Sequence, residues 1–348
     1  MFKELFSKDK VTFSEFVRFA LYSENGYYNK SSIIGRKGDF YTSPSESALF
    51  GKTLGYFISR ISEEKFESNN ISAIELGSNN GDLSKHILDF LFKHHKDLYN
   101  KIEIFIVETN TSHKTIILEN LKEHNEKVFI TDSIKKIQNE NSDCIVFCNE
   151  FFDALPFDRC VFRKKELFQV NLFSDSGEII ENLDKADQPL IDIIDYLKLE
   201  MKEDYFFEIP SYEYREIFKD ISDMWEQVLF LIIDYGDKSN FLNLSADPFG
   251  TARCFYKHNV SRDFYTNVLS QDITHDVHFT LLASISKDFQ FSEIDFKSQS
   301  RFLLENNILD IYKDDKDIAN ISFANDLKKL ISPNFMGERF KLILFEKG

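Results

Sequence analysis

The chain has 348 residues, enough for one large domain with insertions or two modest ones and for a sizeable buried core. Its 42 basic and 58 acidic residues give a formal net charge of −16, which repels phosphate backbones and anionic lipid surfaces. We therefore expect no nucleic-acid partner and no membrane insertion, and a cationic segment of another protein suits this charge better.

The N-terminal stretch MFKELFSKDKVTFSEF mixes acids with lysines and has neither the long apolar region of a signal peptide nor the composition of a transit peptide. No apolar run approaches the ~20 residues that a membrane-spanning helix needs. The four cysteines have no C-x-x-C spacing and lie in apolar runs, as buried free thiols of a reducing compartment do. These features predict a cytoplasmic protein.

Apolar residues recur at helical spacing from Phe13 to Leu21, and Gly26 ends the pattern, so a short helix is expected there. A loop, GRKGDFYT, follows and could be a simple connector or a functional lid. After it, Ser43 and Pro44 with Glu46 provide an N-cap, a first helical proline and a capping-box acid. This pattern predicts a helix that begins at Ser43.

The next part of the chain alternates short apolar strands with amphipathic helices. The expected strands are ISAIEL, KIEIFIVE, VFIT and DCIVFCNE. One helix is indicated by the apolar positions Leu83, Ile87 and Leu91, and another lies near residues 112–124. Near-continuous apolar strands of this kind are typical of a parallel sheet covered on both faces. The sequence therefore predicts an α/β fold with a doubly wound, mostly parallel sheet.

Further on, RCVFRKKELFQVNLF predicts a hairpin, YEYREIFKDISDMW a helix and VLFLIIDYG another central strand. Residues 175–205 are charged and show no clear periodicity, so an irregular insertion or surface excursion is expected there. No proline- or serine-rich linker and no internal repeat divides the sequence, which favours a single elaborated domain.

Two glycines in the loop after the first of these strands indicate a ligand that approaches the backbone closely. Gly77 and Gly81 permit such an approach, and Asn79 and Asn80 tolerate unusual φ while offering amide donors. At the end of the next strand, Glu108 is placed to accept hydrogen bonds from two ribose hydroxyls. A glycine loop with such an acid predicts the binding of an adenosine group.

The spacing of the loop helps to choose among adenosine cofactors. A dinucleotide fold needs G-x-G-x-x-G to admit two phosphates, whereas this loop is G-x-x-x-G with Asn79 in the middle position. S-adenosylmethionine carries no phosphate, and Glu75 supplies an acidic group for a cationic ligand. The loop therefore favours S-adenosylmethionine over NAD. A plain glycine turn without a ligand is the alternative.

The last of the alternating strands ends in NEFFDALPF, which crowds an amide, two carboxylates and two aromatic rings together. We predict that Asn149, Glu150 and Asp153 hold the donor nitrogen of an amine or guanidinium for methyl transfer, and that the two phenylalanines favour a cation. In the alternative interpretation, Asn149 is a cap, Asp153 a turn acid and the phenylalanines belong to the core.

Other polar residues have simpler interpretations. His275 and His278 are flanked by acids in a pattern that can ligate zinc or iron, but a helix start with polar caps explains them as well, and no metal is expected. Arg253 and His258 are expected to orient loops, or to contact the strand end at Asp234 to Gly236, and not to do chemistry.

From about Phe13 to Phe345 the chain resembles the MidA-like methyltransferases, whose mitochondrial members are arginine methyltransferases that assist the assembly of respiratory complex I. The motifs that carry the resemblance are ALYSENGYY, GDFYTSPSES, IELGSNNGDL, VET, NEFFDALPFDR, LIIDYG, GTARCFYKH, QDIT with VHF, SQSRFLL and MGERFKLI. The resemblance implies a class I methyltransferase core with an N-terminal helical lid and insertions. It also implies S-adenosylmethionine as cofactor, arginine in a protein as substrate and a complex I subunit as a partner.

The same resemblance implies the residues around the cofactor, with GDFYTSP and NEFFDALP closing on it. The cofactor-binding residues implied or predicted are Asp39, Thr42, Ser43, Glu75, Gly77, Ser78, Gly81, Glu108 and Asn149. Within one methyltransferase domain at 1–348, we expect a lid region at 1–60, a cofactor-binding half at 70–155 and a substrate-side half at 156–348.

The sequence also departs from the family pattern. Asn79 replaces the usual glycine, Leu269 and Ser270 replace a Pro-Gly pair, and in the segment Asp272–Phe279 a histidine and an aspartate have changed places. This divergent segment leaves a second hypothesis open, in which the protein is a noncatalytic assembly factor or chaperone that retains the methyltransferase fold.

Overall fold

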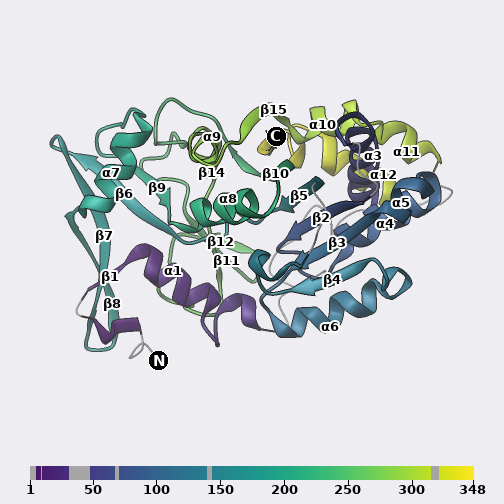
Figure 1. Ribbon diagram of the computed structural model, residues 1–348. Helices are drawn as coiled ribbons and strands as arrows, with labels where there is room; N and C mark the ends of the chain where they lie inside the picture. Colours follow the sequence, from purple (N-terminus) through teal and green to yellow (C-terminus); the bar gives the residue numbers. More distant parts are fainter. Residues whose placement is uncertain (1–4, 9, 31–47, 67–69, 139–142, 315–320) are drawn as a thin grey trace. The chain divides into compact units, whose positions relative to one another are not determined.

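The computed structural model describes residues 5–8, 10–30, 48–66, 70–138, 143–314 and 321–348 (Figure 1). They form two compact units, each assembled from separate stretches of the chain. The hairpin unit takes its residues from within Met1–Ile33, Phe152–Ile217 and Gly236–Asp288, and the sheet unit from within Ile34–Phe151, Phe218–Tyr235 and Phe289–Gly348. That the two units act as one domain stays a prediction.

The sheet unit is built on a sheet with the strand order β15-β16-β10-β5-β2-β3-β4. β2 pairs in parallel with β3 and β5, β3 pairs in parallel with β4, and β5 pairs in parallel with β10. β16 runs antiparallel to both β10 and β15. The sheet is thus mostly parallel, as predicted from the near-continuous apolar runs.

The elements of the sheet unit, in chain order, are α3 (Ala48–Lys65), β2 (Ile71–Leu76), α4 (Asp82–His94), α5 (Lys96–Lys101), β3 (Ile102–Val107), α6 (Thr111–Asn120), η3 (Lys122–His124), β4 (Val128–Thr131), η4 (Ile134–Lys136), β5 (Asp143–Asn149), β15 (Ser292–Ser298), α10 (Gln299–Glu305), α11 (Ile308–Asp314), α12 (Ile321–Ile331), α13 (Met336–Arg339) and β16 (Phe340–Lys347). Two further elements, α8 (Glu213–Met224) and β10 (Gln227–Asp237), have residues in both units.

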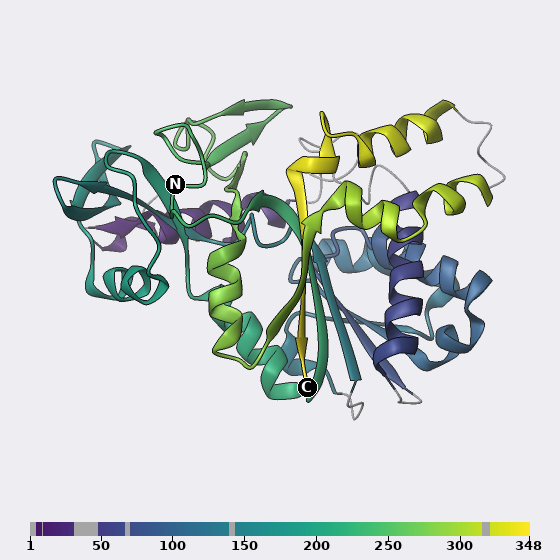
Figure 2. The ribbon, with the colours of Figure 1, turned by 90° about the horizontal axis from the view of Figure 1, so that it is seen from above.

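Helices lie on both sides of the central strands, as Figure 2 shows. On one face, Ala73 and Ile145 belong to an apolar cluster that also includes residues of α3, α4, α6 and α10. On the other face, the ring of Phe218 from α8 lies 5.4 Å from that of Phe230 and 5.6 Å from that of Phe345. Because both faces are covered, the predicted doubly wound α/β architecture is confirmed.

The hairpin unit contains a sheet with the order β1-β7-β6-β9, in which β8 also pairs with β7, and a small sheet with the order β12-β11-β13. Its elements are η1 (Leu5–Ser7), β1 (Val11–Thr12), α1 (Phe13–Tyr22), η2 (Tyr27–Asn29), β6 (Phe157–Arg163), β7 (Glu166–Asp175), β8 (Glu178–Lys185), α7 (Gln188–Leu197), β9 (Phe206–Pro210), β11 (Arg253–Tyr256), β12 (Asn259–Ser261), β13 (Asp272–Thr274), β14 (Val277–His278) and α9 (Phe279–Lys287).

A capping box starts α1. The Thr12 hydroxyl accepts from the Glu15 backbone N–H at 3.2 Å, and the Glu15 carboxylate accepts from the Thr12 N–H at 3.0 Å. The apolar side of α1, which includes Phe13 and Phe16, packs in a core with Phe157 of β6. The helix predicted from apolar spacing is therefore confirmed, and so are the hairpin β6–β7, the helix α8 and the strand β10.

The prediction of an irregular segment at 175–205 is wrong, because β8 and α7 lie there. β8 pairs with β7 along its whole length, from Glu178 to Lys185, but most of its side chains are exposed or half-buried. A strand without a buried face has no alternation of apolar and polar residues for sequence analysis to detect.

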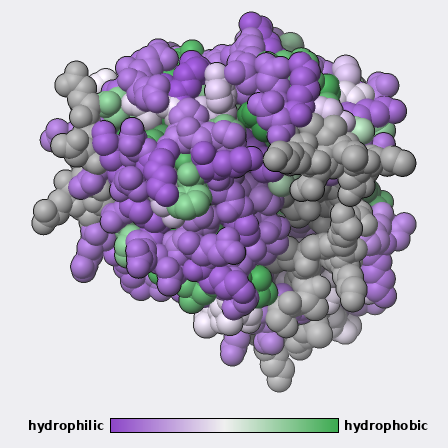
Figure 3. Space-filling model, turned by 90° about the vertical axis from the view of Figure 1, so that its right-hand side faces the viewer, coloured by the Kyte–Doolittle hydropathy of each residue, from purple (hydrophilic) through white to green (hydrophobic). Residues whose placement is uncertain are grey.

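All four cysteines are buried and none of them forms a disulfide, as predicted. Burial raises the pKa of the thiols of Cys144, Cys160 and Cys254. Hydrophilic side chains predominate on the face of the molecule in Figure 3, where hydrophobic side chains are scattered. In the part of the chain that the structure describes, no helix combines the length and the apolar character needed to span a membrane.

Candidate active site

Three strand ends of the sheet unit meet at one edge of its sheet. β2 lies between β3 and β5 and is parallel to both. Gly77 and Glu108, which follow β2 and β3, therefore lie beside Asn149, the last residue of β5. The chain order runs outward from β2 in both directions, which makes this edge the topological switch point where open α/β sheets bind ligands. The prediction that these loops lie together is confirmed.

The loop after β2 is a tight turn with a left-handed backbone at Gly77 (φ +70°), Asn79 (φ +61°) and Gly81 (φ +82°). A Cβ atom on Gly77 would lie 2.6 Å from Cδ2 of Phe151, so a larger residue would displace that ring. Asparagine is among the few side chains that accept the left-handed region readily. Asn79 therefore keeps the turn that a glycine would make, and its predicted tolerance of an unusual φ is confirmed.

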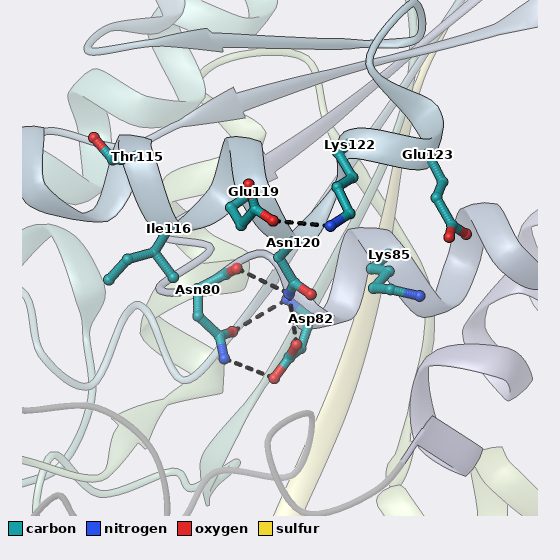
Figure 4. Close-up of a pocket in the computed structure, with 9 residues that line it drawn as sticks. All are labelled: Asn80, Asp82, Lys85, Thr115, Ile116, Glu119, Asn120, Lys122 and Glu123. Atoms are coloured by element: carbon teal, nitrogen blue, oxygen red, sulfur yellow. Dashed lines mark hydrogen bonds and ion pairs between the residues drawn. The ribbon is translucent and has the colours of Figure 1, made fainter.

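Hydrogen bonds tie the turn to the end of α6, as Figure 4 shows. Asn120 Nδ2 donates to the backbone oxygen of Asn80 at 3.1 Å and to Oδ1 of Asp82 at 2.7 Å. Asn80 Nδ2 donates to Asp82 Oδ2 at 2.6 Å, and its Oδ1 accepts from the Asp82 N–H at 3.1 Å. Sequence analysis missed Asn120, because a polar residue at the end of a helix carries no signal of a distant partner.

A groove of about 650 Å³ lies beside this network. Figure 4 shows its lining, which consists of Asn80, Asp82, Lys85, Thr115, Ile116, Glu119, Asn120, Lys122 and Glu123. The groove touches the glycine turn through Asn80 and Asp82, and Asn80 is the only one of its lining residues that the sequence pointed to. We therefore assign the candidate site to the strand ends and not to this groove.

Glu75 lies on β2 just before the turn and is buried, with 3% of its surface exposed. The hydroxyl of Ser84 on α4 donates a hydrogen bond to its Oε2. Burial raises the pKa of the Glu75 carboxyl from 4.5 to about 7, against the opposing effect of the Ser84 hydrogen bonds. This carboxyl therefore changes charge near neutral pH, close to the turn.

Glu108 follows β3, as predicted, and its carboxylate is partly engaged within the protein. Oε1 accepts from the backbone N–H of Asn110 at 2.8 Å, and Oε2 lies 3.4 Å from Nδ1 of His113. Each carboxylate oxygen can accept two hydrogen bonds, so these contacts orient the group and leave acceptor capacity for hydroxyl groups.

The end of β5 holds two of the predicted catalytic residues together. Asn149 Nδ2 donates to Oε1 of Glu150 at 3.0 Å, and Glu150 has a left-handed backbone with φ +50°. The N–H of Glu150 donates to the carbonyl of Ile233, and the N–H of Phe151 donates to Oδ2 of the buried Asp234 at 3.2 Å. β10 thus fixes this turn through its backbone and through Asp234.

Ser78 Oγ, Asn79 Oδ1 and Asn149 Oδ1 are buried at this edge and have no hydrogen-bond partner among the described residues. Buried polar atoms in folded proteins are almost always hydrogen-bonded. The three atoms are therefore suited to a ligand that brings its own donors. S-adenosylmethionine, with an ammonium group and two ribose hydroxyls, fits this set together with Glu108.

Asp153, the third predicted catalytic residue, belongs to the hairpin unit and is 3% exposed. Its carbonyl accepts from the N–H of His275 at 3.2 Å, and the neighbouring carbonyls of Phe152 and Ala154 accept from the hydroxyls of Tyr214 and Tyr22, each at 2.9 Å. The structure therefore brings Asn149 and Glu150 together in the sheet unit and places Asp153 in the hairpin unit.

The remaining polar candidates lie in the hairpin unit. Arg253 donates to the carboxylate of Asp276 at 2.6 Å and to the carbonyl of Thr251 at 3.0 Å, so it orients loops as predicted. His258 is exposed in the turn between β11 and β12. Among the described residues, no group of three or more histidine, cysteine, aspartate or glutamate side chains is arranged to hold a metal ion.

The predicted lid residues Asp39, Thr42 and Ser43, and the helix start predicted at Ser43, lie outside the described residues. Their assignment to the cofactor stays a prediction.

The strand order, with antiparallel β16 between β10 and β15, and the glycine turn at the switch point define a class I S-adenosylmethionine-dependent methyltransferase fold. The chain belongs to the family described as "Putative S-adenosyl-L-methionine-dependent methyltransferase", whose model matches residues 54–294. S-adenosylmethionine is the cofactor of this family, and the predicted resemblance to MidA-like methyltransferases is confirmed.

Relatives of known sequence carry related names. A Drosophila melanogaster protein, "Protein arginine methyltransferase NDUFAF7 homolog, mitochondrial", is 25% identical over 172 residues, which are 44% of this chain and 39% of that protein. The Caenorhabditis elegans protein of the same name is 25% identical over 291 residues, 76% of this chain and 65% of that one. The chain thus matches less than two thirds of the length of either relative.

A solved structure matches nearly the whole chain. It is a COG1565 superfamily member from Burkholderia thailandensis bound to S-adenosyl-homocysteine. With a TM-score of 0.85 and 22% identity, the match covers 99% of this chain and 90% of that one. At this identity the match establishes the fold.

Proposed function

We propose that this protein is an S-adenosylmethionine-dependent methyltransferase that methylates arginine side chains of another protein. The observation that carries the proposal is the hydrogen-bonded pair of Asn149 and Glu150 at the end of β5. The pair lies at the same sheet edge as the glycine turn and Glu108. An acidic group thus stands at the switch point of a sheet whose family uses this cofactor.

S-adenosylmethionine, when bound, supplies a methyl group attached to a positively charged sulfur. In the sheet unit, the residues proposed to hold it are Glu75, Gly77, Ser78, Gly81, Glu108 and Asn149. Glu108 accepts hydrogen bonds from hydroxyl groups, since its contacts with Asn110 and His113 leave acceptor capacity. Ser78 Oγ and Asn149 Oδ1 gain the partners that they lack in the protein.

Glu150 acts on the acceptor. A guanidinium group is protonated at neutral pH, and its nitrogens are weak nucleophiles because they share the positive charge. A carboxylate binds the guanidinium and draws the charge away from the nitrogen that is to be methylated. Asn149 donates to Oε1 of Glu150 and so holds the carboxylate in one orientation. Such preorganisation is the usual source of electrostatic catalysis.

Two observations support arginine in a protein as the substrate. The relatives from Drosophila and Caenorhabditis are named protein arginine methyltransferases, at 25% identity. The chain itself carries a net charge of −16, which suits a cationic partner. The further proposal that this partner is a subunit of respiratory complex I rests on the sequence resemblance alone.

Calorimetry tests the cofactor first. We expect the purified protein to bind S-adenosylmethionine, and binding of NADH in its place would instead indicate a different nucleotide enzyme. Mass spectrometry of wild-type and deletion cells then tests the substrate. Methylated arginines that disappear in the deletion strain would identify both the activity and the target protein.

A complementation experiment separates catalysis from a purely structural role. We expect a Glu108→Ala variant, which loses a proposed ribose contact, to fail to complement a deletion strain while it stays folded by circular dichroism. Full complementation by this variant would contradict the proposal and favour the noncatalytic assembly factor.

A further inference from the structure

The divergent segment Asp272–Phe279 contains two buried histidines with different hydrogen bonds. His278 uses both ring nitrogens within the protein, since Nε2 lies 2.8 Å from the carbonyl of Phe241 and Nδ1 accepts from the N–H of Leu281 at 3.4 Å. The second contact caps the N-terminus of α9. The interpretation of His278 as a helix cap is confirmed.

His275 uses only one of its ring nitrogens. Nδ1 lies 3.0 Å from the backbone carbonyl of Asp276, and a carbonyl can only accept, so Nδ1 carries the proton. Burial lowers the pKa of His275 to about 4, which keeps the ring neutral at physiological pH. Nε2 is then an acceptor, and it is buried without a hydrogen-bond partner among the described residues. The residue is 2% exposed.

Three other residues of the hairpin unit with acceptor groups lie beside His275 along the chain or contact its backbone. The Thr274 hydroxyl is also buried and has no partner in the described part of the chain. The carboxylate of Asp272 accepts from the Tyr28 hydroxyl at 2.8 Å, and the Asp153 carbonyl accepts from the His275 N–H. Burial raises the pKa of the Tyr28 hydroxyl, and interaction with Asp272 and Asp153 raises it further.

These four residues, Asp153, Asp272, Thr274 and His275, are here called the acceptor cluster. The cluster combines two buried aspartate side chains with an imidazole lone pair and a hydroxyl that both lack a hydrogen-bond partner among the described residues. Such a set of acceptors suits a ligand that carries positive charge and several N–H donors. A guanidinium group has five donors in a planar fork, whereas an ammonium group has three and cannot serve as many acceptors.

We propose that Nε2 of His275 accepts a hydrogen bond from the guanidinium group of an arginine in the protein substrate, which the acceptor cluster binds. The identity of the substrate rests on the proposed function. Asp153 and Asp272 balance the charge of the guanidinium, and His278 takes no part because its nitrogens are already engaged.

Nitrogen NMR on the full-length protein labelled with ¹⁵N-histidine tests this directly. The His275 Nε2 resonance, assigned by its absence in His275→Phe, is followed during titration with Nα-acetyl-arginine amide and, separately, with Nα-acetyl-lysine amide. We expect the arginine compound to shift this resonance and to leave the His278 resonances in place. No shift, or the same shift with the lysine compound, would overturn the proposal.

Variants add an independent measurement of affinity for the arginine compound. His275→Phe keeps a ring but removes the acceptor, so we expect binding to weaken about tenfold, as for one hydrogen bond to a charged group. His275→Gln can place an amide oxygen near Nε2 and should restore most of this loss. His278→Gln is the matched control, expected to lower thermal stability without changing the affinity. Equal affinities for wild type and a folded His275→Phe variant would contradict the proposal.

These titrations need no cofactor, so their result does not depend on whether the protein binds S-adenosylmethionine. If the protein binds the arginine compound through His275 but does not bind S-adenosylmethionine, the acceptor cluster is supported and the proposed methyltransferase function is rejected. If the protein binds S-adenosylmethionine but the His275 resonance does not shift, the proposed cofactor is supported and the acceptor cluster is rejected.

Discussion

The side-chain amide of Asn120, at the end of α6, bridges two points of the glycine turn by donating to the Asp82 carboxylate at 2.7 Å and to the Asn80 carbonyl at 3.1 Å. The turn after β2 is therefore held from outside as well as by its own backbone. A residue far along the chain from the turn thereby controls the shape of the candidate cofactor site.

We expect Asn120→Ala to weaken the binding of S-adenosylmethionine about tenfold, because the loss of two hydrogen bonds frees the turn. Isothermal calorimetry measures the affinity. Glu119→Gln is the control, since Glu119 lines the same groove but bonds only the exposed Lys122 among the described residues. An Asn120→Ala variant that loses thermal stability but keeps wild-type affinity would show that the bridge serves folding alone.

Replacing Asn79 tests whether the missing glycine weakens the site. Because Asn79 already adopts φ +61°, we expect Asn79→Gly to keep cofactor affinity within about threefold of the wild type. Asn79→Val should weaken binding more than tenfold, since a β-branched residue is strongly disfavoured in the left-handed region. Equal affinity in all three proteins would mean that the conformation of this turn does not govern binding.

The raised pKa of Glu75 predicts that the free energy of unfolding depends on pH. Its folded-state pKa of about 7 lies above the ordinary value of 4.5, so its contribution to stability is fully present below pH 4.5 and is lost as pH rises through 7. The loss amounts to about 3 kcal/mol from the size of the shift. Urea unfolding of the ligand-free protein at pH 5 and pH 8 should show this decrease for the wild type and a smaller one for Glu75→Gln. If the free energy of unfolding changed equally with pH in the wild type and in Glu75→Gln, the raised pKa of Glu75 would be refuted.

Glu150→Gln keeps the shape of the side chain and removes its charge. We expect cofactor affinity to stay within a few-fold of the wild type and single-turnover methyl transfer to fall about a hundredfold or more, the scale for one preorganised electrostatic group. Asp153→Asn should lose less, because Asp272 of the acceptor cluster still balances the charge of the guanidinium. Wild-type transfer by Glu150→Gln would move the reaction centre elsewhere, with Asp234 and Arg253 as the next candidates.

Much of the sheet unit was predictable from sequence because its strands are buried on both faces. A run such as Ile71–Leu76, with every residue buried, leaves a clear apolar signature, and glycines mark the turn that follows. The switch point then follows from chain order, so the sequence alone is enough to assign Gly77, Glu108 and Asn149 to one edge of the sheet.

The remaining features depend on contacts that a single sequence does not record. β8 was missed because an exposed edge strand needs no apolar alternation. The Asn120 bridge joins two helices whose sequences give no sign of each other. The difference between His275 and His278 depends on which carbonyl lies within reach of each ring, which only the folded chain decides.

The antiparallel strand β16 lies between β10 and β15 in the sheet, although it follows both of them in the sequence. During synthesis, the edges of β10 and β15 that pair with β16 therefore stay open until β16 has left the ribosome and inserted between them. Pairings across such long sequence separations form slowly, and open strand edges invite association with other chains. The nascent protein thus exposes two open strand edges, and with them a risk of aggregation, until its sheet closes.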